Sequence, residues 1–250
     1  MDLFLAGNDP WREKGVYDET IKKGVKILES FCYVDKWSEW LIPQTEKYLL
    51  DSGAFTYLYS NKGKSGVDWN DYIARYADFI NRNDVKLFFE LDIDSIVGYE
   101  NVIKLRKRLE AETGKKPIVV WHPNRGKDEF LKSCEEYPYV ALGGIVGAEI
   151  SRAQYEKRFP WFIQEAHKRG AKIHGLGYTK LKGLEVNHFD SVDSTSWLSG
   201  NRFGSVYRFN GKTIEQVGRK PGQRMKNTKA LAAHNFDEWV KFQKYAATHL

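Results

Sequence analysis

Residues 47–56 read KYLLDSGAFT, and this stretch decides the fold because it shows how a buried strand ends. The apolar run Tyr48–Leu50 stops at an aspartate, Asp51, and small residues follow at once. Ser, Gly and Ala after such a run indicate a tight turn, and a run of this length is typical of a β-strand. The expected strand covers 47–52, and its last two positions carry a carboxylate and a hydroxyl.

Similar apolar runs recur along the chain, and amphipathic stretches separate most of them. The expected strands are 2–7, 26–34, 47–52, 86–92, 117–122, 139–144, 171–177 and 188–194, and the expected helices between them include 69–82, 99–112 and 152–169. The segment 26–34 fits a helix equally well. Eight strands that alternate with helices predict an α/β fold, a (β/α)8 TIM-like barrel.

The pattern changes after residue 200. Residues 205–217 predict a β-hairpin that turns at Asn210-Gly211, a dipeptide typical of a type I′ turn. The segment 217–229 carries five basic residues and no acid around a Pro-Gly, which indicates a basic loop, either a solvated one or one that contacts phosphates. An amphipathic helix, 236–249, closes the chain. We expect a single domain over 1–250, with 205–229 as an insertion or extension.

Bulk composition narrows the class of protein. The chain has 250 residues and a net charge of +6, which favours a polyanionic partner without requiring one. Cys32 and Cys134 lack the spacing of a cysteine-rich zinc site and are expected to be buried thiols. No apolar run approaches the roughly 18–20 residues of a membrane span, and the acidic start is unlike a signal peptide. A cytoplasmic protein is expected, in the host cytoplasm if it is phage-encoded.

Polar residues gather where the expected strands end. They are Asp51 and Ser52; Glu90, Asp92 and Asp94; Trp121 and His122; Gly143 and Gly144; His174 and Gly175; and Asp190 and Asp193. The alternation of Glu90, Asp92 and Asp94 would place all three on one face of their strand. In a barrel the carboxyl ends of the strands meet in one mouth, where active sites lie.

Each of these residues alone has an ordinary explanation, such as a helix cap, a tight turn or a packed histidine. Together they indicate chemistry, because carboxylates gathered in one place are costly unless protons or ligands offset them. Two carboxylates beside a sugar can displace a group at the anomeric carbon through a covalent intermediate. Backbone N–H groups of a glycine turn can bind a carbonyl oxygen, and aromatic rings can stack on a base. Exchange at an N-glycosidic bond and ordinary sugar hydrolysis both fit this set.

Four motifs in order resemble the tRNA-guanine transglycosylase superfamily. They are DSGAFT (51–56), ALGGIVGAE (141–149), HGLG (174–177) and VDSTSW (192–197). Given the small size of the chain, the closest resemblance is to the phage-type enzymes that insert 7-deazaguanine bases into DNA. The resemblance implies that Asp193 is the nucleophile that attacks C1′, and that Asp51 is the general acid and base.

The same resemblance implies how the base is held. Asp92 would read its Watson–Crick edge, and the backbone of Gly143, Gly144 and Ile145 would meet its exocyclic oxygen. Phe55 and His174 would sandwich the ring, and His122 stands where the family usually has glutamine. Ser52 and Gly175 complete the implied base-binding set. A rival match, HFDSV (188–192), would make Asp190 the nucleophile. Asp193 is preferred because the residues after it match the archaeal-type motif over a longer stretch and because its distance from Gly177 is nearer to that in the family. Residues three apart on a strand point to opposite faces, so both cannot face the mouth unless the strand bends.

One departure concerns the substrate. The tRNA enzymes carry a cysteine-rich zinc site after the nucleophile, and the hairpin and basic loop occupy its place here, so no metal and no cofactor is expected. We expect guanine and a 7-deazaguanine such as preQ0 as small-molecule substrates, and DNA as the polynucleotide with tRNA as the alternative. No membrane partner is expected. A homodimer is possible, and the sequence does not fix the oligomeric state. The residues expected to contact phosphates are Arg219, Lys220, Arg224 and Lys226. A glycoside hydrolase and a non-catalytic nucleic-acid-binding protein are two further functions that the sequence leaves open.

Overall fold

The computed structural model describes residues 1–7, 24–53, 56–57, 66–144, 152–178, 180–199, 204–217 and 228–250. Six of the residues expected at the site or on DNA lie outside these ranges, namely Phe55, Ile145, Arg219, Lys220, Arg224 and Lys226. Their expected contacts with the base and with phosphates therefore stay predictions.

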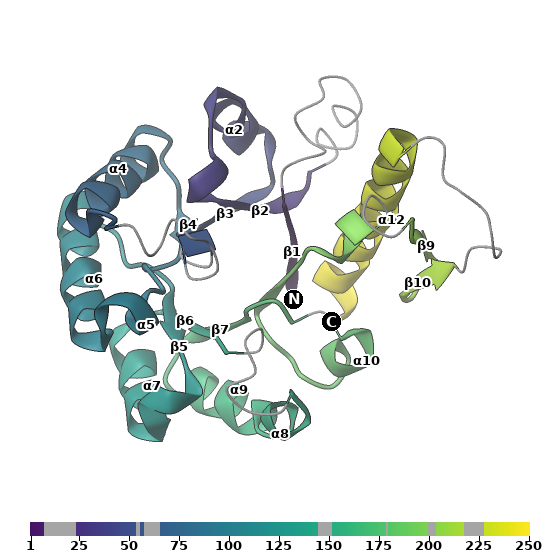
Figure 1. Cartoon of the computed structure of the whole chain (residues 1–250). Coiled ribbons are helices and arrows are strands. Elements are labelled where there is room, and N and C mark those ends of the chain that lie inside the picture. The colour runs from purple at the N-terminus through teal and green to yellow at the C-terminus, as the bar shows by residue number, and fades with distance from the viewer. Residues whose placement is uncertain are drawn as a thin grey trace.

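Eight parallel strands form one curled sheet in the order β4-β3-β2-β1-β8-β7-β6-β5. The two outer strands meet through a parallel bridge between Phe89 and Ile118, and the N–H of Glu90 donates to the carbonyl of Ile118 at 3.0 Å. The sheet therefore curls round on itself in a TIM-like α/β fold (Figure 1). The strands are β1 (Asp2–Ala6), β2 (Lys26–Ser30), β3 (Lys47–Asp51), β4 (Leu87–Phe88), β5 (Val119–Trp121), β6 (Tyr139–Leu142), β7 (Lys172–Gly175) and β8 (Ser191–Ser194).

All eight expected strands are present, although each is shorter than its apolar run. The segment 26–34, which fitted a strand and a helix equally well, contains both: β2 ends at Ser30, and a 3-10 helix, η2 (Phe31–Tyr33), follows. The expected helix 152–169 is two helices, α8 (Arg152–Glu156) and α9 (Phe159–Lys168). Pro160 lies in the first turn of α9, where its missing N–H costs nothing, and a single helix through that point would lose a hydrogen bond.

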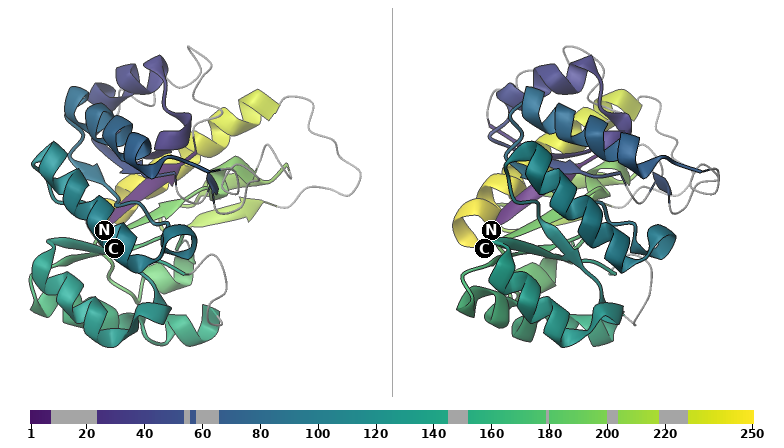
Figure 2. Two further views of the ribbon diagram at one scale, coloured as in Figure 1. Left: turned by 60° about the vertical axis from the view of Figure 1, so that its left-hand side comes forward. Right: turned by 90° about the vertical axis from the view of Figure 1, so that its left-hand side faces the viewer.

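Helices cover the outside of the sheet (Figures 1 and 2). Besides α8 and α9 they are α2 (Lys36–Leu41), α4 (Trp69–Arg82), α5 (Asp94–Val97), α6 (Tyr99–Thr113), α7 (Gly126–Glu136), α10 (Leu181–Leu184) and α12 (Thr228–His249), with the 3-10 helices η3 (Ile42–Gln44), η5 (Pro123–Arg125) and η6 (Ser196–Leu198). The start of α4 is set by Asp68, whose carboxylate accepts from the N–H groups of Asn70 and Asp71. No helix within the described ranges is both long and apolar enough to cross a membrane.

Side chains on each strand alternate between the interior of the sheet and the helical layer. The interior cluster is small and comprises Phe4, Ala6, Leu28, Leu49, Phe89, Ile118, Val120 and Ala141. Two larger clusters lie between the sheet and the helices, and they contain the intervening residues of the same strands, such as Leu3, Leu50 and Val140. This alternation determines which polar side chains at the strand ends point inward.

The C-terminal part forms a hairpin and a long helix beside β1. The strands β9 (Val206–Phe209) and β10 (Ile214–Val217) pair antiparallel, and the loop between them has four residues instead of the expected two. Asn210 holds this loop, because its side chain accepts from the N–H groups of Lys212 and Thr213. The helix α12 begins eight residues before the expected 236. The buried side chain of Gln243 on α12 bonds to the backbone of Leu3 and Lys26, which ties α12 to β1 and β2.

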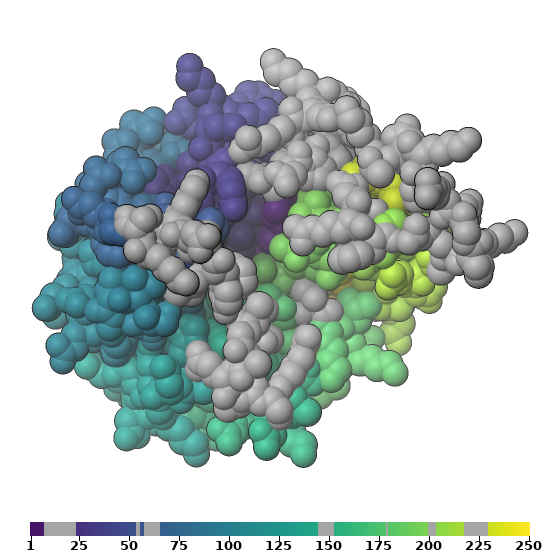
Figure 3. All heavy atoms as spheres, in the orientation of Figure 1, coloured from purple at the N-terminus to yellow at the C-terminus, as the bar shows by residue number. Residues whose placement is uncertain are grey.

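The two chain termini lie together at one end of the sheet, and the carboxyl ends of the strands point to the other (Figure 2). The amino group of Met1 donates to the carbonyl of Ala246 at 3.3 Å. We call the end formed by the carboxyl ends of β1–β8 the mouth; it faces the viewer in Figure 1. In the space-filling view of this face, purple N-terminal atoms show at the floor between blue and green segments (Figure 3).

Candidate active site

Three carboxylates from different strands meet in the mouth. Asp51 ends β3, Asp193 lies near the end of β8, and Asp92 follows β4. Leu49, two residues before Asp51 on β3, points into the interior of the sheet, so Asp51 points the same way. The charges of Asp193 and Asp92 both act on the carboxyl of Asp51, so the three groups share one electrostatic environment.

A tight turn after β3 holds Asp51 in place. The N–H of Gly53 donates to Oδ2 of Asp51 at 3.0 Å, and Gly53 has a positive φ of 78°. A Cβ at this position would lie 2.3 Å from Sγ of Cys32, so the close approach of η2 to the turn after β3 requires glycine. In the sequence DSG, the glycine is the residue type that allows the turn in which its N–H binds the carboxylate of Asp51.

The surroundings raise the pKa of Asp51 from 3.8 to about 6. Burial is the main cause, and the negative charges of Asp193 and Asp92 add to it. The N–H of Gly53 and the hydroxyl of Ser30 act in the opposite direction. Near neutral pH this carboxyl therefore exists in both protonation states, as a group that gives and takes protons must.

Asp193 is held by two N–H donors on one of its oxygens. Oδ1 accepts from the N–H of Gly177 at 2.6 Å and lies 3.2 Å from Nε2 of His174. Oδ2 receives no donor from the described residues. The carboxylate is thus fixed through Oδ1 and presents Oδ2, which is the arrangement that a nucleophilic carboxylate needs.

Asp190, the rival nucleophile, lies at the other end of the sheet. It precedes β8, and its carbonyl accepts from the N–H of Asp2 at the start of β1. Its carboxylate accepts from the N–H of Ile173 at 2.8 Å and lies 2.9 Å from Nε2 of His167. Asp190 therefore supports the amino ends of β7 and β8 and cannot serve the mouth.

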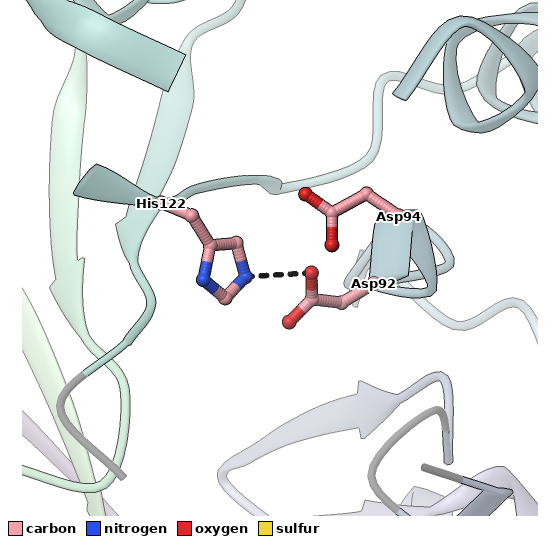
Figure 4. Close-up of side chains that lie close together, drawn as sticks. All are labelled: Asp92, Asp94 and His122. Carbon is pink, nitrogen blue, oxygen red and sulfur yellow. Dashed lines mark hydrogen bonds and ion pairs between the residues drawn. The ribbon is translucent and has the colours of Figure 1, made fainter. Parts of the chain in front are cut away.

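His122 follows β5 and faces Asp92 across the mouth (Figure 4). Its Nε2 lies 2.8 Å from Oδ1 of Asp92. Burial alone would lower the pKa of His122, but the hydrogen bond and the charge of Asp92 outweigh it, and the pKa is raised. The pair therefore offers both a donor and an acceptor at the mouth.

Asp92, Asp94 and His122 are also the described residues that best fit a metal site. One ligand atom from each lies within 4.8 Å of the others (Figure 4). Those atoms are already engaged, because Nη2 of Arg125 lies 2.8 Å from Oδ2 of Asp94 and 3.9 Å from Oδ1 of Asp92. A metal ion would have to displace this buried guanidinium, so hydrogen bonds and ion pairs account for the cluster.

Arg125 belongs to an ion-pair network beside the mouth that the sequence does not reveal. The network continues through Glu90, which accepts from Nε of Arg106 at 2.6 Å and from the N–H of Val120 at 2.8 Å. Glu90 is fully buried beside α6, so it does not share a face with Asp92 as expected. The one feature of the sequence that indicates this buried network is Arg106, a charged residue on the otherwise apolar inner side of the helix 99–112. The network joins β4, β5 and α6 and thereby positions Asp92.

Alternation of side chains turns two of the expected base-binding positions away from the mouth. Ser52 follows Asp51 and lies against α4, where its carbonyl accepts from the hydroxyl of Tyr72 at 2.5 Å. Gly175 is buried on the outer side, since a Cβ there would meet Tyr178, Phe189 and Val192 within 3.3 Å. Their side-chain positions therefore face the helical layer and not the mouth.

Gly143 does face the mouth, but its backbone is engaged. Its N–H donates to Trp121 at 2.8 Å and its carbonyl accepts from Tyr155 at 2.9 Å. A Cβ at this glycine would lie 2.8 Å from the ring of His122, so the absence of a side chain leaves room for that ring. Of this glycine pair, Gly144 is the one left as a candidate for binding an exocyclic oxygen.

His174 is inside the sheet, beneath the mouth. Its side chain is 0% exposed, between the rings of Phe4 and Phe89 at centroid distances of 6.5 and 5.2 Å. A fully buried ring offers no face for stacking, so the expected sandwich does not form with His174. Its contact with Asp193 is the role that the sequence did not indicate.

Comparisons with known proteins add little to this description. No family model matches the chain, and no curated protein matches it. Among solved structures, the carboxyl transferase domain of pyruvate carboxylase from Rhizobium etli, with pyruvate, is similar over 99% of this chain and 49% of its own, at 14% identity and a TM-score of 0.46. The chain thus spans about half of that structure, and a likeness at this level carries no argument about the reaction.

Replacing Gly53 with alanine should lower the free energy of unfolding more than the same replacement at a glycine that has only a positive φ. We expect Gly53→Ala to destabilise the protein by about 2–4 kcal/mol, because the new Cβ meets Cys32 in addition to the backbone strain. Gly114→Ala is the matched control, since Gly114 also has a positive φ and no other atom lies within 4 Å of the place that a Cβ would take there. Urea unfolding of both variants measures the difference, and equal losses would contradict the account of the turn.

The raised pKa of Asp51 predicts a stability that depends on pH. Folding raises this pKa, so the folded state binds the proton more tightly and loses stability as the pH rises from about 4 to 6. Above pH 6 the ionised carboxylate costs about 1–3 kcal/mol, which Asp51→Asn should recover at pH 8 and not at pH 4. Asp94→Asn makes the same change of charge but removes a partner of Arg125, so it should lower stability at pH 8. A loss for Asp51→Asn at pH 8 would count against a raised pKa.

Proposed function

We propose that the protein exchanges guanine in DNA for a 7-deazaguanine base through a covalent intermediate on Asp193. The observation that carries this proposal is the pairing of a proton-exchanging carboxyl, Asp51, with a carboxylate that presents one oxygen, Asp193. A retaining displacement at C1′ requires these two groups in one site. The order of the four motifs, which resembles the tRNA-guanine transglycosylase superfamily, supplies the choice of base and sugar.

In the first step Oδ2 of Asp193 attacks C1′ of the target nucleotide. The C1′–N9 bond breaks, the C1′–O bond to Asp193 forms, and protonated Asp51 gives its proton to the leaving guanine. A pKa of about 6 supports this role, because a useful fraction of Asp51 carries a proton near neutral pH. The donors on Oδ1 of Asp193 are suited to orient the carboxylate before the attack.

The second step reverses the first with a different base. The N9–H of the incoming 7-deazaguanine, such as preQ0, loses its proton to ionised Asp51. Its N9 then attacks C1′, and the bond to Asp193 breaks. Asp51 is protonated again at the end, so the cycle consumes no cofactor and needs no oxidant or reductant.

Recognition of the base would fall to Asp92 and His122. Oδ1 of Asp92 is bound to His122, so Oδ2 is left to accept from the N–H groups on the Watson–Crick edge of guanine. Gly144, with a φ of 75°, is the described backbone position suited to meet the exocyclic oxygen. Nη2 of Arg125 lies 3.9 Å from Oδ1 of Asp92 and 2.8 Å from Oδ2 of Asp94, which is suited to orient these carboxylates.

DNA is proposed as the polynucleotide for two reasons. The net charge of +6 favours a polyanion, and the cysteines that hold zinc in the tRNA enzymes are lacking from this sequence. A guanine inside a duplex would have to be flipped out or offered single-stranded to reach the mouth.

Incorporation of labelled preQ0 or guanine tests the proposal. We expect the wild type and Asp190→Asn to place label in DNA, whereas Asp193→Asn should lose at least about 100-fold because it lacks the nucleophilic oxygen. The two variants make the same change three residues apart, so Asp190→Asn controls for fold and charge, and circular dichroism checks folding.

Different results in this assay separate the competing functions. Label in tRNA alone would keep the chemistry and overturn the substrate. Guanine released without incorporation would indicate a hydrolase. Activity in Asp193→Asn equal to that of the wild type would overturn the proposed mechanism.

A further inference from the structure

Four side chains form a continuous hydrogen-bonded series that ends at Asp193. The hydroxyl of Tyr139 lies 2.5 Å from Oγ of Ser191, and that Oγ lies 2.5 Å from Nδ1 of His174. Nε2 of the same ring lies 3.2 Å from Oδ1 of Asp193. The bond-making steps proposed above do not explain why Tyr139, Ser191 and His174 lie there.

The series lies inside the curled sheet, on three adjacent strands. Tyr139 begins β6, His174 is on β7 and Ser191 begins β8, two residues before Asp193. His174 and Ser191 are partners in the register of β7 and β8, and both are 0% exposed. Aromatic side chains surround the histidine ring, with Phe4 and Phe89 against it. Polar groups buried at this depth are costly unless all are bonded, and these form one connected set.

The hydrogens of the series have one consistent direction. Nε2 can bind a carboxylate oxygen only by donating its hydrogen, and a ring that carries this single hydrogen has Nδ1 as an acceptor. Ser191 has a single hydrogen, and it must then point to Nδ1 of His174. Its oxygen accepts from the hydroxyl of Tyr139, which burial keeps protonated by raising its pKa. Tyr139 and Ser191 thereby select the ring form that donates to Asp193.

We propose that His174 is a positioning residue for the nucleophile, and that Ser191 and Tyr139 fix the tautomer in which it acts. The inference rests on the proposed role of Asp193. Together with the N–H of Gly177, the ring holds Oδ1 of Asp193 and so directs Oδ2 toward C1′. This explains why a fully buried histidine lies beneath the mouth, where an apolar side chain would fill the same space at lower cost.

Kinetics of two His174 variants test this role. His174→Gln keeps an N–H donor for Asp193 and a carbonyl acceptor for Ser191, whereas His174→Leu keeps the volume without either. We expect His174→Leu to lower kcat by about 100-fold with KM for DNA and base nearly unchanged, and His174→Gln to stay within about 10-fold of the wild type. Ser191→Ala should fall between them, and Tyr139→Phe should have the smallest effect.

A purely structural role would give a different result. Leu28→Ala removes volume from the same interior and should lower stability while kcat is kept. If His174→Leu behaves like Leu28→Ala, or if Gln and Leu at position 174 are equally active, the proposal is wrong.

The tautomer of His174 can be determined by NMR without an assay of enzymatic activity. The chain has six histidines, so ¹⁵N-histidine labelling gives a simple NMR spectrum in which His174→Gln assigns the His174 signals. We expect a proton on Nε2 and none on Nδ1 in the wild type, and loss of this single form in Ser191→Ala. A proton on Nδ1 alone would overturn the proposal, because Nε2 could then not donate to Asp193. Inactivity of the wild type on DNA and on tRNA would instead count against the proposed function and leave the NMR result to judge the tautomer.

Discussion

The constraint on which the site depends is the alternation of side chains along eight parallel strands. Because side chains along a strand alternate with a period of two residues, Asp51, Asp193 and His174 point inside the curled sheet. Ser52, Val192 and Gly175 occupy the positions that face the helical layer. A shift of one residue in any of these strands would exchange the two sets. The bridge between Phe89 and Ile118 brings β4 against β5, which sets Asp92 opposite His122.

Carboxylates that lie close together repel one another, and the surroundings of each one offset this repulsion in a different way. Asp51 takes up a proton more readily, since burial and its neighbours raise its pKa to about 6. Asp193 is stabilised by two N–H donors, and Asp94 by Arg125. Chemically identical side chains thus lie in different environments, and the proposed mechanism assigns them the different roles of acid and nucleophile on that basis.

Much of the fold could be predicted from the sequence, because apolar runs and turn residues are local signals. The sequence also showed that only one of Asp190 and Asp193 can face the mouth, since residues three apart on a strand face opposite ways, and the longer motif match favoured Asp193. The side-chain positions of Ser52 and Gly175 face away from the mouth because a residue next to an inward one in the sequence lies on the other face of the strand. Arg125 and the series from Tyr139 to His174 could not be predicted, as their contacts depend on how neighbouring strands are aligned.

The most direct test of the proposed chemistry is to find where the sugar is attached. The protein is mixed with a guanine-containing oligonucleotide without incoming base, denatured, and digested with nuclease and trypsin. Cleavage after Lys182 and Arg202 yields one peptide that holds both Asp190 and Asp193, and its fragment masses distinguish them. We expect a deoxyribosyl group on Asp193. A sugar on Asp190, or none while the base is being exchanged, would contradict the proposed chemistry.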